Sequence, residues 1–299
     1  MFLPLTLALF VAVCFGVSKV LIRKATNVGT LRTVLYTLIL APPLLLSFSL
    51  LNGESFLSYN YSSWILINLA LAGITFLVAG RIFAYSSIRL IGAARSSQLT
   101  STQVIFAAIL SIAFLQEEMS AILLIGTLAI FLGTILISLS YPRGEENRTV
   151  MPRRNFSKGF SLGLLGGFFW GLSQLFSREG VRGLGSPAIA SFLSYLFAIS
   201  FLILIMPVTQ SKKEEAKPQK AEAIYVLAAG ALSTFAVLAQ YTALRIADVV
   251  WVTPIVNTSP LVTLVVSYFF IQKVEFVNTK VIFGCLAIIF GAFIIALNA

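Results

Sequence analysis

The sequence of 299 residues contains no histidine, only two cysteines and only 11 acidic residues, against 21 lysines and arginines. Without histidine it lacks the commonest metal ligand and the commonest general acid or base. Cys14 and Cys285 lie in separate apolar segments, which predicts apolar filler rather than a disulfide or metal framework. We therefore expect no metal, no cofactor and no enzyme built on a metal cluster or an acid–base pair.

Charge is also scarce, at 11% of residues against about 25% in soluble domains, while 58% of residues are hydrophobic. Uncharged apolar stretches of about 20 residues recur along the chain, and each is a candidate membrane-spanning helix. The alternation of β-barrel strands is not visible. The sequence predicts an all-α integral membrane protein with ten transmembrane helices. The expected spans are Phe2–Ile22, Thr30–Leu51, Trp64–Tyr85, Gly92–Leu115, Ser120–Ser140, Gly159–Phe176, Pro187–Met206, Ala223–Leu244, Val249–Ile271 and Lys280–Leu297.

The net charge of +10 is distributed unevenly along the chain. Sixteen of the 21 basic residues fall in every second connector between the expected spans, that is, on one side of the membrane. The positive-inside rule places these sixteen in the cytoplasm, and both termini outside the cell membrane. The first span lacks a charged segment before it and carries Lys19, so we expect it to be retained rather than cleaved as a signal peptide. The basic excess indicates topology and contact with membrane lipid rather than nucleic acid.

The two halves of the chain resemble each other across a polar connector. Glu117–Ser138 and Glu275–Ala296 match at a constant offset of 158, with identical glycines, and two shorter blocks follow the same order. We expect a first repeat at 1–145, a cytoplasmic connector at 146–157 and a second repeat at 158–299. Because each repeat holds five helices, an odd number, the second repeat would enter the membrane inverted. Inverted repeats are typical of secondary transporters, whose substrate site lies near the midplane.

Glycines recur in the expected sixth helix in "GFSLGLLGGFFWG", where Gly159, Gly163, Gly167 and Gly171 lie four apart and on one side. Such residues weaken a helix in water but allow close helix contact in lipid. They predict either a static packing face or a surface on which one repeat slides during gating. The pairs Gly126 with Gly133 and Gly284 with Gly291 predict similar contacts on the fifth and tenth helices.

Polar residues gather in the fourth and ninth helices. "RSSQLTSTQVIF" (Arg95–Phe106) holds too many hydroxyls and amides to face lipid, so they either line a cavity or bond to neighbouring helices. In "TPIVNTSP", Pro254 and Pro260 free backbone carbonyls around Asn257 and Thr258. The residues expected to line the substrate cavity are Ser18, Tyr85, Gln98, Ser101, Thr102, Trp170, Ser173, Gln174, Tyr241, Asn257 and Thr258. For the aromatic residues, an interfacial belt is the alternative.

Apart from Arg32, Arg95 and Lys280, which lie within the first four residues of their spans and count with the connectors, Lys19 and Arg81 are the only cations inside the expected spans, near their cytoplasmic ends. We expect both to snorkel to the interface; if they face the cavity instead, they favour an anionic substrate. No aspartate or glutamate lies deep in any span, so proton coupling has no evident carrier, and exchange or uniport stays open beside antiport. Glu117 and Glu275 are expected as charges at helix N-termini.

Several of these residues carry a family resemblance. A tryptophan–glycine pair occurs in the first helix of the second repeat as Trp170–Gly171, and the first repeat departs from it with Phe15–Gly16. The fourth helix of the second repeat carries Pro260, where the first repeat has Thr102. A glutamate, Glu117 or Glu275, precedes the glycine-containing segments "IGTLAIFLG" and "FGCLAIIFG". In them the chain resembles the EamA-like group of the drug/metabolite transporter superfamily. The resemblance implies two five-helix repeats and ATP-independent export or import by alternating access. It also implies cytoplasmic termini, against the charge distribution, which we follow here.

The sequence as a whole predicts a secondary carrier of small polar or amphipathic metabolites, with amino acids among the candidates. Anionic sugar or phosphate derivatives are the alternative substrates, and a channel or a membrane-embedded enzyme are the alternative functions. The expected partners are a small-molecule substrate and membrane lipid, and the expected state is a monomer or weak homodimer.

Overall fold

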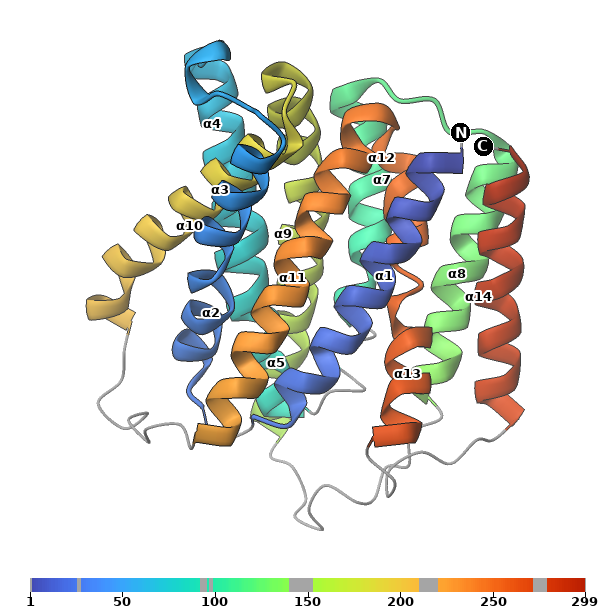
Figure 1. Cartoon of the computed structure of the whole chain (residues 1–299). Helices are drawn as coiled ribbons and strands as arrows, with labels where there is room; N and C mark the ends of the chain where they lie inside the picture. The colour runs from blue at the N-terminus through green and yellow to red at the C-terminus, as the bar shows by residue number, and fades with distance from the viewer. Residues whose placement is uncertain are drawn as a thin grey trace.

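The computed structural model describes residues 2–25, 28–91, 96, 99–139, 153–209, 220–270 and 279–298, and their regular structure is entirely helical. The helices stand side by side as one bundle, with both termini at the same end (Figure 1). Eight of the described helices are long and apolar enough to cross a membrane, and two shorter apolar helices cover Leu99–Leu115 and Ala121–Leu136. The prediction of an all-helical, multi-pass membrane protein is confirmed; the count of ten crossings stays a prediction.

The first half of the chain holds two interrupted spans. Its elements are α1 (Phe2–Arg23), α2 (Thr30–Ile39), α3 (Ala41–Leu51), a 3-10 turn (Phe56–Ser58), α4 (Ser63–Ala72), the π-helix η2 (Gly73–Gly80), α5 (Arg81–Ile91), α7 (Gln103–Leu115) and α8 (Ala121–Leu139). Pro42 and Pro43 lie in the first turn of α3, where they lack the N–H that would continue α2. The helix expected to end at Tyr85 continues to Ile91, so Arg81 lies further from its end than the sequence suggested.

The second half contains one divided span. Its elements are α9 (Arg153–Leu184), α10 (Pro187–Thr209), α11 (Lys220–Ile246), α12 (Val249–Val256), α13 (Ser259–Phe270) and α14 (Thr279–Asn298). The expected ninth helix is divided at Asn257 and Thr258, which form a turn. Pro260, the second residue of α13, has no N–H to donate to the last turn of α12, which favours an interruption here, although Pro254 lies inside α12 without ending it. The break places polar backbone inside the bundle.

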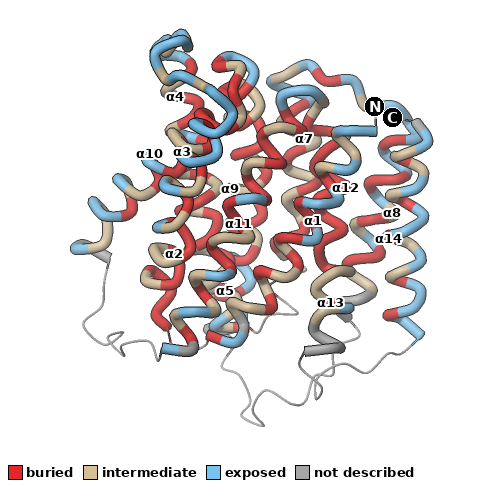
Figure 2. The backbone as a smooth tube through the Cα atoms, viewed as in Figure 1, coloured by how far each residue is buried: buried red, intermediate tan, exposed pale blue. Residues whose placement is uncertain are grey.

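The two halves exchange their first helices. α1 packs along α11, α12 and α13 of the second half, whereas α9 packs along α4, η2, α5 and α7 of the first. α8 and α14 lie together at one edge of the bundle (Figure 1). Their outer faces carry exposed apolar side chains, including Leu132 and Phe283, while buried residues follow the inner faces (Figure 2). This outward apolar surface suits a protein whose solvent is lipid.

Glycine pairs bring α8 and α14 into backbone contact. A Cβ added to Gly126 would lie 2.9 Å from the carbonyl oxygen of Gly291, and one added to Gly133 would lie 2.6 Å from that of Gly284. Because the earlier glycine of α8 faces the later glycine of α14, the two helices run antiparallel.

The glycine face of α9 lies against the first half. Gly159 and Gly163 meet Ile91 and Ser87 of α5, and Gly167 and Gly171 meet the chain from Leu99 to Ala107. At Gly171 an added Cβ would lie 2.9 Å from the carbonyl oxygen of Gln103 and 2.9 Å from the backbone nitrogen of Ala107. These are backbone atoms, which cannot rotate away as a side chain can.

We therefore expect Gly171→Ala to lower the free energy of unfolding by about 1–3 kcal/mol, because a methyl group forces α9 away from α7. Gly183→Ala on the same helix is the control, since its Cβ would meet only side-chain atoms of Ile65. Thermal unfolding of both variants in detergent is the measurement. Equal melting temperatures for the two variants would contradict the backbone contact.

Candidate functional site

A buried polar contact joins the two halves at the break between α12 and α13. Gln103 on α7 donates through Nε2 to Asn257 Oδ1 at 3.2 Å, and Asn257 is 1% exposed. Asn257 Nδ2 has no partner, and neither has the buried hydroxyl of Thr253 one turn earlier. Buried polar atoms are nearly always hydrogen-bonded, so unused capacity here marks a place where a polar ligand can bind. Gln103 was not among the residues selected from the sequence.

A second set of polar contacts lies on α9. Trp170 donates through Nε1 to the carbonyl oxygen of Phe76 at 3.2 Å, within the π-helix η2. Gln174 Oε1 accepts from Gln240 Nε2 at 2.7 Å, and Gln240 Oε1 is buried without a partner. Ser173 bonds only to the carbonyl of its own helix, at Trp170. Gln174 and Gln240 thus link α9 and α11 and retain one free acceptor.

Tyr241 lies inside the bundle at 3% exposure. Its hydroxyl donates to Ser194 Oγ at 2.9 Å and accepts from Ser177 Oγ at 3.3 Å. An interfacial belt, the alternative that the sequence left open, does not fit a phenol buried in this way. Three helices of the second half, α9, α10 and α11, meet at this hydroxyl.

The remaining predicted residues make contacts of other kinds. Ser18 donates to the carbonyl of Ala229 at 3.1 Å and lies 3.0 Å from Ser233 Oγ, so it joins α1 to α11. Thr102 and Thr258 donate to carbonyls of their own turns. Ser101 is buried, Tyr85 is half-buried on α5, and Gln98 lies outside the described residues. The residues expected to line one cavity are therefore distributed over separate polar contacts, at Asn257, at Gln174, at Tyr241 and at Ser18.

The two cations inside the spans, Lys19 and Arg81, are buried to different extents, and each donates to a hydroxyl group on another helix. Lys19 is half-buried and donates through Nζ to Ser259 Oγ at 3.1 Å, next to the break between α12 and α13. Arg81 is only 4% exposed and donates through Nη1 to Thr37 Oγ1 at 2.7 Å. The guanidinium of Arg81 is therefore turned into the bundle, whereas snorkelling would have taken it to the interface.

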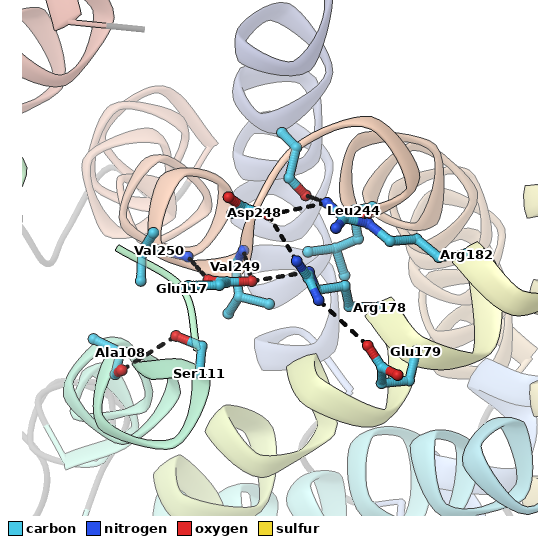
Figure 3. Close-up of polar contacts among 11 residues, drawn as sticks. Ala108, Ser111, Glu117, Arg178, Glu179, Arg182, Leu244, Asp248, Val249 and Val250 are labelled. Carbon is cyan, nitrogen blue, oxygen red and sulfur yellow. Dashed lines mark hydrogen bonds and ion pairs between the residues drawn. The ribbon is translucent and has the colours of Figure 1, made fainter. Parts of the chain in front are cut away.

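A cluster of ion pairs lies at the end of the bundle that carries both termini, where α11 leads into α12 (Figure 1), and Figure 3 shows its side chains. Arg178 of α9 contacts Glu117 through Nε at 2.9 Å, Asp248 through Nη2 at 2.8 Å and Glu179 through Nη1 at 3.3 Å. The Glu117 side chain is 1% exposed and that of Arg178 12%. Glu117 belongs to the first half and Arg178 to the second, so this contact joins them.

The carboxylate of Glu117 also caps α12. Its two oxygens accept from the backbone nitrogens of Val249 and Val250, each at 3.0 Å (Figure 3). A negative charge at this position also interacts favourably with the dipole of α12. The sequence had suggested a helix-terminal role, but the helix proves to be α12 of the other half rather than the one that follows Glu117. Glu275 lies outside the described residues.

Asp248 adds a second acidic group to this end of the bundle. Burial raises its pKa, but hydrogen bonds from Arg178 and Arg182 outweigh that effect, so the pKa lies below its ordinary value of 3.8. Arg182 also donates to the carbonyls of Leu244, at 3.0 Å, and Ala247, at 2.8 Å, at the end of α11. The carboxylate of Asp248 therefore stays ionised at neutral pH.

Within the described part of the chain, no three histidine, cysteine, aspartate or glutamate side chains are grouped as metal ligands. The chemistry that these residues offer is binding through hydrogen bonds and ion pairs.

Comparisons with known proteins agree with this architecture. The model of the EamA-like transporter family matches residues 3–139 and again residues 157–297. A solved structure titled "Crystal structure of protein" superposes with a TM-score of 0.78 at 16% identity over 99% of each chain, which shows a shared fold. A search of the curated proteins finds no significant match. Because the family model matches almost the whole chain in two consecutive copies, the protein belongs to the EamA-like transporter family and is a multi-pass membrane transporter of the drug/metabolite type.

Proposed function

We propose that the protein is a secondary carrier of the cell membrane that moves small polar or amphipathic metabolites, amino acids among them, by alternating access. Two five-helix halves of opposite orientation form the carrier, and the substrate binds between them. The distribution of basic residues supports a topology in which both termini and Glu117 lie outside. No ATP-binding element is needed for such a mechanism.

The contact between α8 and α14 supports the inverted arrangement. The offset of 158 relates Gly126 to Gly284 and Gly133 to Gly291. Exchanging the two halves therefore converts the contact of Gly126 with Gly291 into that of Gly284 with Gly133, which is the other contact observed. A two-fold axis between the halves requires this reciprocity.

The observation that carries the proposal is the buried contact between Gln103 and Asn257. It joins the two halves where the helix breaks, and Asn257 Nδ2 and Thr253 Oγ1 remain free to bind. Broken helices at the interface of two repeats are typical substrate sites in secondary transporters. The ion pairs around Arg178 would then close one end of the path.

Electrostatics suits the ion pair of Glu117 and Arg178 to a reversible closure. Burying two charges carries a desolvation penalty that nearly offsets their attraction. Water that enters when this end opens would hydrate both groups, so the open and closed forms can lie within a few kcal/mol of each other. A carrier needs such a balance between its two states.

Transport by the purified full chain tests this proposal. A thermal-shift screen of amino acids and other metabolites would identify a ligand, and counterflow of that ligand in proteoliposomes should saturate, as expected of a carrier. We expect Asn257→Ala to weaken the affinity about tenfold, because one hydrogen bond is worth about 1–1.5 kcal/mol. Uptake against substrate concentration is the measurement.

Asn68→Ala is the matched control, since Asn68 is equally buried but its side chain donates to Trp64 within its own helix. In that variant, the substrate concentration that gives half-maximal counterflow should equal that of the parent. Ion conductance without saturation would instead favour a channel, and unchanged affinity in Asn257→Ala would remove Asn257 from the site.

Glu117→Gln should open the end that carries the ion pairs. The change leaves Arg178 without its buried partner and weakens the cap of α12. A cysteine introduced at Thr253, in a chain whose Cys14 and Cys285 are replaced by serine, should then react faster with a membrane-impermeant maleimide. We expect an increase of at least about tenfold in the labelling rate, because breaking a buried pair costs several kcal/mol.

Glu118→Gln supplies the control, because Glu118 is exposed and directly follows Glu117. Its labelling rate should match that of the parent. If Glu117→Gln and Glu118→Gln label equally slowly, the ion pair does not control access from this end.

A further inference from the structure

Arg81 is a buried cation without a buried anion. It follows the π-helix η2 directly and is 4% exposed. Ile91, the last residue of α5, lies ten positions further along the chain, or about 15 Å of helix, which is about half the thickness of the hydrocarbon core. Among the described residues no carboxylate is found in contact with Arg81, whereas Arg178 and Arg182 form ion pairs with carboxylates.

Three side chains with neutral hydroxyl groups lie near the guanidinium. Thr37 of α2 accepts from Nη1 at 2.7 Å, and Tyr85 lies one turn further along α5. The phenol of Tyr195 on α10 lies close to both Arg81 and Thr234 of α11. Tyr195 is 0% exposed, and no atom is placed to form a well-aligned hydrogen bond with its hydroxyl. Side chains from both halves therefore face one guanidinium.

A charge in this position is unfavourable unless something compensates it. A guanidinium carries five N–H donors, and a cation at membrane depth costs several kcal/mol when it is left unpaired. A hydroxyl satisfies a donor but brings no negative charge. The planar fork of arginine matches carboxylate and phosphate groups, with which it forms its strongest hydrogen bonds.

We propose that Arg81, together with Thr37 and Tyr195, binds the anionic group of the transported metabolite, so that the substrate carries a carboxylate or a phosphate. This inference rests on the proposed carrier function and names its substrate class. Because Thr37 and Arg81 belong to the first half and Tyr195 to the second, a bound anion contacts both halves. The substrate itself supplies the negative charge that the described residues around Arg81 lack.

Anion-dependent stability of the purified full chain tests the site without a known substrate. The melting temperature is measured against rising sodium acetate, benzoate or inorganic phosphate, with sodium chloride at equal ionic strength and acetamide as references. We expect at least one anion to raise the melting temperature above the chloride reference, and acetamide to have no effect. Acetate or benzoate acting alone would assign a carboxylate, and phosphate acting alone would assign a phosphoryl group.

Variants connect the effect to Arg81. Arg81→Gln should weaken the effective anion by about 10- to 100-fold, as expected for lost hydrogen bonds to a charged group. Tyr195→Phe removes only an oxygen that has no well-placed partner, and it should weaken binding of the effective anion several-fold. This variant also tests the site if Arg81→Gln does not fold. Arg89→Gln, an exposed arginine of the same helix, should leave the response unchanged.

The anion site would be overturned if no anion raised the melting temperature of the parent above the chloride reference. It would also be overturned if Tyr195→Phe and Arg81→Gln both responded to anions like the parent. Transport separates this outcome from failure of the carrier proposal. Saturable counterflow of a neutral or cationic compound, unaffected by Arg81→Gln, would leave the carrier standing and remove the anion site. Arg81-dependent anion binding without counterflow of the same anion would retain the site and remove the carrier.

Discussion

Helices in a bilayer gain nothing by moving apolar side chains from lipid to protein, so close backbone contact and polar pairs must hold them together. The contact of α8 with α14 satisfies this constraint with almost no polar chemistry. Gly126 and Gly133 admit the backbone of Gly291 and Gly284, and the large apolar residues between them face lipid or the next helix. One such pair of helices links the two halves at the edge of the bundle, away from the polar contacts at its centre.

The glycine face of α9 applies the same constraint at the centre. Because Gly167 and Gly171 let α9 approach the start of α7, Trp170 between them comes within reach of the π-helix. Gly80 allows the indole ring to lie against η2, since an added Cβ would collide with that ring. π-helical turns are rare and often occur at functional sites. Here the turn precedes Arg81, so the packing of α9 and the position of the guanidinium depend on each other.

Hydropathy predicted the helical class and most spans, because a lipid-facing helix must be apolar over its whole length. The glycine spacing likewise indicated where α8, α9 and α14 make close contact. Helix ends were harder to place: the prolines at 254 and 260 did not reveal where α12 would end, and no residue near Tyr85 marked the continuation of α5 to Ile91. Glu117 finds its partners 132 and 133 residues away, at Val249 and Val250, and no local pattern encodes such a distance. Tyr195 carried no signal at all, because a tyrosine among apolar residues looks like a core residue until its neighbours are known.

The contrast between two buried arginines ties these observations together. Arg178 contacts the three carboxylates of Glu117, Glu179 and Asp248, so its charge is compensated from within the chain. Arg81, deeper in the bundle, donates to the hydroxyl of Thr37 and lies near Tyr85 and Tyr195, and among the described residues no carboxylate is found in contact with it. Compensated charge contributes to structure, because its partners are always present. In the anion site that we propose, the charge of Arg81 contributes to affinity instead, because the incoming ligand supplies the missing partner. The two arginines lie at different places in one bundle, Arg178 at the end that carries the termini and Arg81 in its interior.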